Sequence, residues 1–198
     1  MKELNKEISI IIILYKEEFE LLKKCLKNIF GFKIIIIDND GNSELKRKIE
    51  KEFNIYKYVL NKENVGLSKA ANKAIELVDT PFVLNLQADC EITNPDIDKL
   101  HQALKKYDNS FLVSPTFYSD NKLTFNSTPL PEKQIDQKVL KIEGDVCVDT
   151  VLASVIFFKK EEFIKLGGFD EFFFLYFLDY DLCRRILNKK NQLYNYTM

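Results

Sequence analysis

The first half of the chain alternates between short, continuous apolar runs and segments in which apolar residues recur at helical spacing. The runs ISIIIIL at 8–14 and KIIIID at 33–38 are rich in β-branched residues, which is typical of strands buried on both faces. Shorter runs predict further strands at 56–60 and 81–87. Helices are expected over 17–30, 45–53 and 67–78. Strands that alternate with helices indicate right-handed crossover units, so we predict an α/β fold with a parallel sheet.

The second half of the chain has a different pattern. A helix is expected over 95–107, followed by the apolar runs FLVSPTF at 111–117 and VLASVIFF at 151–158. A polar, turn-rich stretch over 119–143 separates the two runs and predicts one long loop. Because no internal repeat or linker is present, the sequence predicts a single domain over 1–198, whose central sheet continues as a mixed sheet.

Polar residues follow each of the four predicted parallel strands. Tyr15 follows the first strand, Asp38 ends the second, Asn61 to Gly66 follow the third, and Gln87-Ala88-Asp89 follow the fourth. Ligands of open α/β sheets bind outside the carboxyl ends of the strands, where the strand order reverses. These polar residues therefore predict a site along one edge of the sheet.

Each polar group suits a particular ligand chemistry. Asp38 can accept hydrogen bonds from a ribose or a base edge. Asn64-x-Gly66 precedes a helix, so backbone N–H groups and the helix N-terminus can face a phosphate, although a simple cap and turn would look the same. Asp89, with Glu91 two residues on, can hold a hard divalent cation, although a turn carboxylate would also look the same.

Composition narrows the function classes. Of the 198 residues, 29 are basic and 30 acidic, which gives a net charge of -1 and argues against a nucleic-acid partner. The four cysteines form no C-x-x-C pair and the first seven residues are polar, so we expect a reduced, cytoplasmic protein. The single histidine, His101, argues against a Ser-His-Asp hydrolase. The sequence contains neither the P-loop motif G-x-x-x-x-G-K-[ST] nor the dinucleotide-binding motif G-x-G-x-x-G.

The segment GGFDEFFFLYFLDYDLCRR, from Gly167 to Arg185, joins a glycine turn, a dense aromatic run and two closely spaced acids. Together with the segments ISIIIILYKEE, IIIIDNDGN, NKENVGLSKAANKAI and FVLNLQADCEI, it resembles the family-2 inverting glycosyltransferases. The resemblance is to the rhamnosyltransferase-like branch, which builds bacterial surface polysaccharides. It covers Ile8 to about Asn188 and implies the glycosyltransferase A fold. In that fold a Rossmann-like nucleotide-sugar-binding half, here about 1–92, joins an acceptor half, here about 93–198.

The resemblance also implies roles for individual residues. Residues that would contact the nucleotide donor are Tyr15, Asp38, Asn64, Gly66, Asn72 and Gln87. Asp89 would coordinate Mg²⁺ or Mn²⁺, as the last acid of the family's D-x-D motif does. Asp179 would be the general base that takes a proton from the acceptor hydroxyl. Asp181 and Arg185 would support the loop.

The implied reaction transfers a sugar, with inversion, from a nucleotide-diphosphate sugar to a saccharide or lipid-linked acceptor. The family context places such transfer in the cytoplasm, at the inner face of the cell membrane, and allows peripheral membrane association. The sequence ends at Met198, so we expect a member that is shortened at its C-terminus.

Two alternatives remain open. A catalytically impaired domain that binds a nucleotide sugar or a partner is one, because Leu178 stands where the family has the acidic neighbour of the base. A nucleotidyltransferase is the other, although YKEEFE follows the first strand where such enzymes carry a Gly-rich basic segment.

Overall fold

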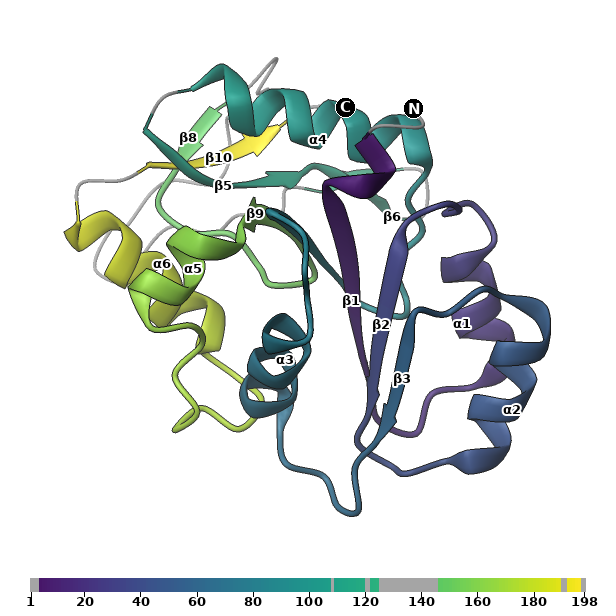
Figure 1. The fold of residues 1–198 in the computed structure, drawn as a ribbon. Helices are drawn as coiled ribbons and strands as arrows, with labels where there is room; N and C mark the ends of the chain where they lie inside the picture. The colour runs from purple at the N-terminus through teal and green to yellow at the C-terminus, as the bar shows by residue number, and fades with distance from the viewer. Residues whose placement is uncertain (1–3, 108, 120–121, 125–145, 190–191, 197–198) are drawn as a thin grey trace.

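The computed structural model describes residues 4–107, 109–119, 122–124, 146–189 and 192–196. Its central element is an eight-stranded sheet with the order β3-β2-β1-β4-β9-β5-β10-β8 (Figure 1). The first four strands are parallel: β1 (Ile8–Leu14), β2 (Lys33–Asp38), β3 (Lys57–Leu60) and β4 (Phe82–Leu86). β2 and β3 extend the sheet on one side of β1, whereas β4 pairs on the other side. The strand order therefore reverses between β1 and β4.

The remaining strands make the sheet mixed. β9 (Val155–Lys159) runs antiparallel to both β4 and β5 (Ser110–Pro115). β10 (Gln192–Tyr196) is parallel to β5, and β8 (Val146–Val148) is antiparallel to β10. A separate two-stranded ribbon pairs β6 (Phe117–Ser119) with β7 (Lys122–Thr124). The predicted α/β class and mixed central sheet are confirmed.

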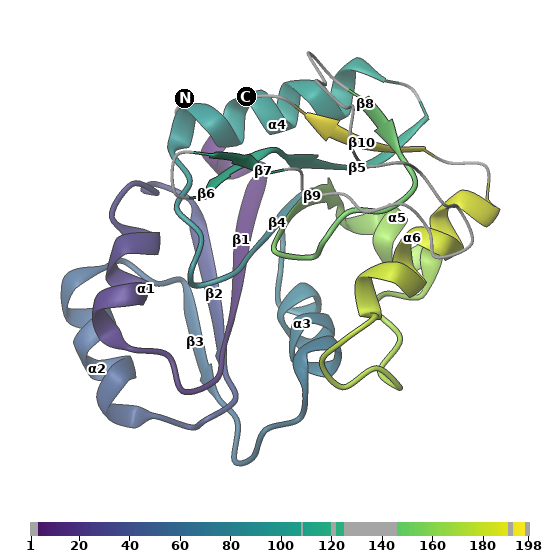
Figure 2. The same cartoon turned by 180° about the vertical axis from the view of Figure 1, so that it is seen from behind.

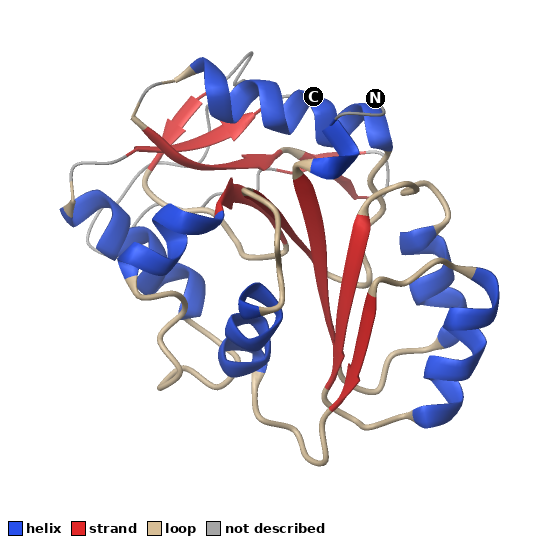
Figure 3. Cartoon of the chain, viewed as in Figure 1, coloured by secondary structure: helices blue, strands red, loops and turns tan. Residues whose placement is uncertain are grey.

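Helices cover both faces of the sheet, as Figures 2 and 3 show. Ile10, Ile12 and Leu14 of β1 share one core with α1 (Phe19–Leu26), α2 (Ser43–Glu52) and α4 (Asn94–Lys106). Ile11 of β1 faces the opposite core, with α3 (Leu67–Glu76), α5 (Lys160–Leu166) and α6 (Leu178–Asn188). Because successive side chains of a strand point to opposite faces, a strand covered on both sides must be apolar throughout. This explains the isoleucines from Ile10 to Ile13, and the buried Ser9 of the same strand accepts a hydrogen bond from Thr80 Oγ1 at 2.8 Å.

The sequence pattern located most of these elements but missed some. The continuous runs at 8–14 and 33–38 are β1 and β2 with the same bounds. Only the second half of the apolar run at 151–158 is a strand, because residues 151–154 form a loop before β9. A short 3₁₀ helix (Leu4–Lys6), α5, β8 and β10 were not anticipated. Within the predicted loop at 119–143, Lys122–Thr124 form strand β7, so the prediction is wrong there, and most of the rest lies outside the described residues.

Phe163 anchors α5 against the sheet. Its ring stacks on Phe158 of β9 at 4.4 Å between centroids and meets Phe169 edge-on at 5.1 Å. We expect Phe163→Ala to lower the free energy of unfolding by about 3–5 kcal/mol, because it leaves a cavity in a packed core. Ile164→Ala, one residue along and 54% exposed, is the matched control and should cost much less. Urea denaturation followed by circular dichroism measures both, and equal losses would contradict this account of the core.

Buried thiols make the stability sensitive to alkaline pH. Burial raises the pKa of Cys25 and of Cys183 from 9.0 to about 12. Below pH 9 both the folded and unfolded states keep these protons, so the stabilisation is fully present. As the pH rises from about 9 toward 12, the unfolded chain releases protons that the folded chain retains, and stability is lost.

We therefore expect the unfolding free energy, measured in urea under reducing conditions, to fall between pH 9 and pH 11. Each buried thiol contributes a slope of about 1.4 kcal/mol per pH unit. Cys183→Ala should make that slope shallower by one such contribution, whatever its effect at pH 7. A variant with the slope of the unmodified chain would show that Cys183 titrates normally when folded.

Candidate active site

The carboxyl ends of β1 and β4 meet at the point where the strand order reverses. A small cavity of about 10 Å³ lies there. Its lining includes Asn85 from β4, Gln87 directly after β4, and Leu178 from α6. Asn85 donates from Nδ2 to the carbonyl of Ala153 at 2.6 Å, and the N–H of Gln87 donates to Ser154 O at 2.8 Å. These bonds join the loop before β9 to the end of β4, so this loop covers one side of the sheet edge.

The turn after β1 brings Tyr15 to this edge in an exposed position. Tyr15 is 47% exposed, and Lys16 Nζ lies 5.2 Å from its ring centroid. Lys16 has a φ of +61°, a left-handed conformation that is uncommon outside glycine. An exposed ring on such a turn suits stacking against a flat group such as a nucleobase.

Asp38 lies at the end of β2 and is almost fully buried, at 1% exposure. Its Oδ1 accepts the N–H groups of Asp40 and Gly41 at 2.8 and 3.1 Å, and its Oδ2 accepts the hydroxyl of Tyr58 at 3.1 Å. Burial, with the charge of Asp38 and this hydrogen bond, raises the pKa of Tyr58. In the structure Asp38 therefore shapes the turn after β2, and its contact with a nucleoside stays a prediction.

The N-terminus of α3, expected to face a phosphate, is covered by another part of the protein. Asn64 Oδ1 accepts the N–H of Gly66 at 3.0 Å, which forms the expected turn. The next N–H, that of Leu67, donates to Phe174 O at 2.6 Å, and Ser68 Oγ donates to Phe173 O at 2.5 Å. Gly66 has a φ of +87°, and a Cβ there would lie 2.7 Å from Phe174. Backbone carbonyls of the segment 169–177, which we call the aromatic loop, occupy this helix end.

Asn72 also contacts the aromatic loop. Its amide hydrogen-bonds both the N–H and the carbonyl of Phe169, at 3.0 and 2.8 Å. The structure thus brings Asn72 and the aromatic loop together, whereas the sequence predicted that Asn72 lines the donor site.

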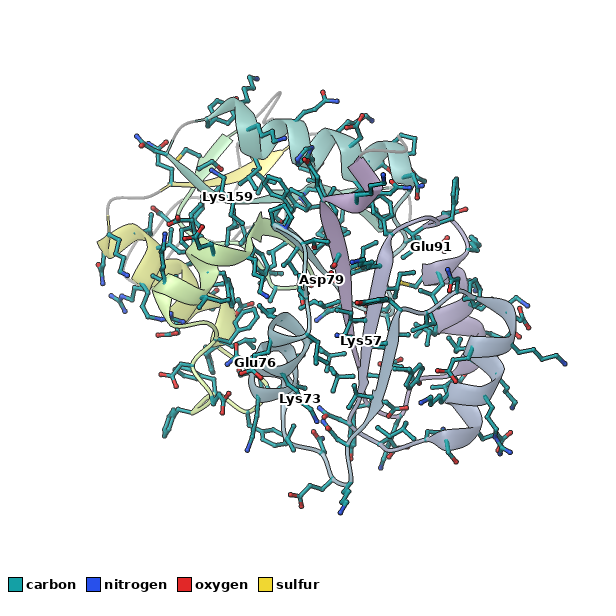
Figure 4. The ribbon with its side chains drawn as sticks, viewed as in Figure 1. Lys57, Lys73, Glu76, Asp79, Glu91 and Lys159 are labelled. Atoms are coloured by element: carbon teal, nitrogen blue, oxygen red, sulfur yellow. The ribbon has the colours of Figure 1, made fainter. Side chains whose placement is uncertain are left out.

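Two carboxylates interact electrostatically beside the β1–β4 reversal. Asp89 is exposed after β4, and Glu17 follows the turn after β1. Burial, and then the negative charge of Asp89, raise the pKa of Glu17. Glu91 instead pairs with Lys27 at 2.9 Å, and Figure 4 places it beside α1. Glu17, which the sequence analysis did not single out although it stands three residues after β1, is therefore a carboxylate that is electrostatically coupled to Asp89.

Asp179 lies in the first turn of α6, next to the edge. The neighbouring Leu178 is 3% exposed and lines the cavity together with Gln87, which brings the start of α6 over the end of β4. Asp179 is partly exposed, and its Oδ1 accepts the N–H of Tyr180 at 3.0 Å. The residue before α6, Phe177, has a φ of +66°. Besides Lys16, it is the only non-glycine residue with positive φ in the described part of the chain.

Buried amides form a network that the sequence analysis did not predict, although it named Asn61 among the polar residues that follow the third strand. Asn61 Nδ2 donates to Asn39 Oδ1 at 2.7 Å, and Asn39 Nδ2 donates to Gly66 O at 3.2 Å. Lys73, labelled in Figure 4 on α3, donates to Asn61 Oδ1 at 2.6 Å. The network ties the ends of β2 and β3 to α3. An asparagine directly after a buried strand was the available signal for both amides.

With this geometry in view, comparison with known proteins identifies the family. The glycosyl transferase family 2 profile matches residues 9–161, so the chain belongs to that family. That range contains the edge built from β1 to β4.

Two curated relatives are similar in sequence. The low-salt glycan biosynthesis hexosyltransferase Agl10 of Haloferax volcanii is 27% identical over 90% of this chain. Glycosyltransferase GlyA of Streptococcus pneumoniae serotype 4 is 26% identical over 60% of it. The chain covers 61% of the length of the first protein and 18% of the second, so it spans only part of each.

Solved structures share the fold at low sequence identity. GalNAc-T7 with UDP, GalNAc and Mn²⁺ superposes with a TM-score of 0.71 at 16% identity, over 96% of this chain and 44% of that one. The mannosyltransferase PcManGT of Pyrobaculum calidifontis, in complex with GDP-Man and Mn²⁺, gives 0.68 at 15%, over 94% and 53%. S. aureus TarS 1-349 gives 0.64 at 15%, over 97% and 58%. The expected glycosyltransferase A fold is confirmed. No helix in the described ranges is long and apolar enough to cross a membrane.

Arg185 fixes the start of the aromatic loop to α6. Its guanidinium donates to Asp181 Oδ2 at 2.7 and 2.6 Å, and to the carbonyls of Leu166 and Gly168 at 3.1 and 2.8 Å. This is the supporting role that the sequence predicts for Asp181 and Arg185.

We expect Arg185→Lys to lower the unfolding free energy by about 1–2 kcal/mol, because a single ammonium cannot reproduce the fork of donors. Arg184→Lys, at the exposed neighbouring position, should change it by less than about 0.5 kcal/mol. Urea denaturation of both variants tests this, and a loss confined to Arg184→Lys would refute it.

Proposed function

We propose that the chain carries the nucleotide-sugar half-site and the general base of a glycosyltransferase that transfers a hexose with inversion. The observation that carries the proposal is that a family-2 chain gathers Tyr15, Gln87, Asp89 and the start of α6 at its strand-order reversal. Open α/β sheets bind ligands at this position. The halves about 1–92 and 93–198 would divide donor from acceptor binding.

The donor would lie across the ends of β1 and β4. Tyr15 would stack against the base, and the turn held by Asp38 would present its backbone and carboxylate to the ribose. Gln87 would approach the sugar diphosphate, and Asn64 and Gly66 would shape the turn beside it, because the aromatic loop occupies the adjoining end of α3. The relatives bound to UDP or GDP-Man support a nucleoside diphosphate sugar as the donor class.

The residues at this edge fit a hard divalent cation. In the described part of the chain no three His, Cys, Asp or Glu side chains gather as a complete metal site. Asp89 and Glu17 nevertheless supply two carboxylates, and burial, followed by the charge of Asp89, raises the pKa of Glu17. Mg²⁺ binds in this way, through one or two carboxylates plus substrate phosphates. Asp89, with Glu17, would hold Mg²⁺ or Mn²⁺, and the cation would neutralise charge on the departing diphosphate.

Asp179 would act on the acceptor. Its carboxylate would accept the proton of the acceptor hydroxyl while that oxygen attacks the anomeric carbon from the face opposite the diphosphate. A single base on that face gives inversion. The acceptor would be a saccharide or a lipid-linked saccharide, used in surface polysaccharide or glycoconjugate synthesis in the cytoplasm, with peripheral contact to the inner membrane face.

One observation favours a second candidate function, a domain that binds a nucleotide sugar or a partner without transferring sugar. Leu178 stands where the family has an acid and is buried at 3% exposure in an apolar core. A carboxylate partner for Asp179 is therefore missing at that position.

Binding and turnover separate these functions. We expect a millimolar nucleoside diphosphate (UDP, dTDP or GDP) with Mn²⁺ to raise the melting temperature, since a ligand at 100 times its Kd adds about 2.7 kcal/mol of stability. Asp89→Asn should remove the Mn²⁺-dependent part of the shift, whereas Asp98→Asn, on the surface of α4, should keep it. Asp179→Asn should keep the shift and abolish release of nucleoside diphosphate from a panel of nucleotide sugars.

The outcomes exclude one another. The absence of a shift with all three nucleotides would sink the transferase and the nucleotide-sugar-binding domain, and would leave only partner binding. A shift without transfer by the unmodified chain would favour the binding domain, and turnover by the Asp179→Asn variant would remove Asp179 as the base.

A further inference from the structure

Asn72 makes an unusually complete set of contacts with a segment far away in the sequence. The N–H of Phe169 donates to Asn72 Oδ1 at 3.0 Å, and Asn72 Nδ2 donates to Phe169 O at 2.8 Å. The side-chain amide therefore pairs with one residue's backbone as a neighbouring strand would. Nδ2 also donates to Glu171 Oε1 at 3.2 Å. Since an asparagine amide has two N–H donors, both are engaged by the aromatic loop.

Other contacts extend this anchoring along the loop. From the same helix, the N–H of Leu67 and the hydroxyl of Ser68 bind the carbonyls of Phe174 and Phe173. The loop then passes through Phe177, with a φ of +66°, directly into α6 and Asp179. Because the chain from Phe169 to α6 is short and held by its backbone, displacing its start would displace Asp179.

The glycine pair before the loop shows how closely Asn72 approaches. A Cβ on Gly168 would lie 2.8 Å from Asn72 Oδ1, whereas a Cβ on Gly167 would meet nothing within 4 Å. Both glycines have positive φ, +71° and +100° respectively, so a side chain at either is strained. Alanine at Gly168 disturbs the Asn72 contact as well, which makes Gly167 a matched control.

We propose that Asn72 is a positioning residue: it holds the aromatic loop in the path that presents Asp179 and is not itself a ligand of the nucleotide. The role of Asp179 rests on the proposed function. The path of the loop does not, because it is defined by hydrogen bonds within the chain.

The first test measures the loop directly. Phe172, Phe174, Tyr176 and Phe177 are exposed, at 87%, 55%, 72% and 65%, so chymotrypsin can report whether the loop leaves α3. We expect Asn72→Ala and Gly168→Ala to raise the initial rate of cleavage within 172–177 about tenfold, a loss of local protection of about 1.4 kcal/mol. Gly167→Ala and Glu76→Ala should leave it within about twofold. Glu76 lies one turn from Asn72 on α3 and is labelled in Figure 4.

An exchange of the amide and the carboxylate between positions 72 and 171 distinguishes the loss of this contact from general unfolding. Asn72→Asp keeps the shape but loses the donors and places a carboxylate against Glu171. Adding Glu171→Gln supplies an amide that can donate to the new carboxylate, so the double variant should regain part of the protection. Circular dichroism checks that each variant is folded.

The second test separates positioning from ligand binding. For Asn72→Ala we expect kcat to fall at least about tenfold, with the KM for the donor and the Kd for UDP, dTDP or GDP with Mn²⁺ within about twofold. Unchanged protection of the loop would overturn the proposal, and so would a tenfold weaker nucleotide Kd at unchanged kcat, which identifies a donor ligand. If the unmodified chain transfers no sugar, the proposed function fails, while the cleavage rates still decide whether Asn72 holds the loop.

Discussion

The burial of β1 on both faces is the constraint on which the rest of the structure depends. Its isoleucines face α1, α2 and α4 on one side and α3, α5 and α6 on the other, so neither layer can be lost without exposing a strand that has no polar face. β1 also separates the two directions in which the sheet grows. The strand that contributes to both cores therefore also lies at the reversal of strand order, with Tyr15 directly after its carboxyl end and Gln87 directly after that of β4.

This dependence explains which parts of the fold the sequence predicts. β1 and β2 are continuous apolar runs bounded by polar residues, and a local pattern suffices to place them. β10 pairs in parallel with β5, about eighty residues earlier, and β8 then pairs with β10. β8 has only three apolar residues and β10 includes polar residues, so pairing with a distant partner, and not a long apolar run, marks them as strands. α5 follows β9 without a break or a side-chain cap, so the sequence contains no boundary signal there.

The sequence likewise predicts some features of the candidate site and not others. Chain order and the strand-edge rule place Tyr15, Gln87 and Asp89 together. The partners of Asn72, however, stand ninety-seven or more positions later, and a pattern of residue types cannot show that its amide is engaged there. Asp38 is at the predicted strand end, but its burial beneath Tyr58 depends on the pairing of β2 with β3. The two left-handed residues, Lys16 and Phe177, flank this site, and strained backbone of this kind gathers where a structure holds functional groups in place.

The anchoring of the aromatic loop has a consequence for how such a protein can change. Most of the atoms that fix the loop and the glycine before it belong to the backbone: the N–H and carbonyl of Phe169 and the carbonyls of Gly168, Phe173 and Phe174. The Glu171 carboxylate is the side-chain exception. The side chains at 172 and 174–177 are all exposed. Mutation can therefore exchange the chemistry displayed beside Asp179 while the main chain keeps its course. The contacts that hold the main chain are thus different from the side chains exposed beside Asp179. Substitutions at a few surface positions would then change which acceptor molecules fit, while the same scaffold is kept.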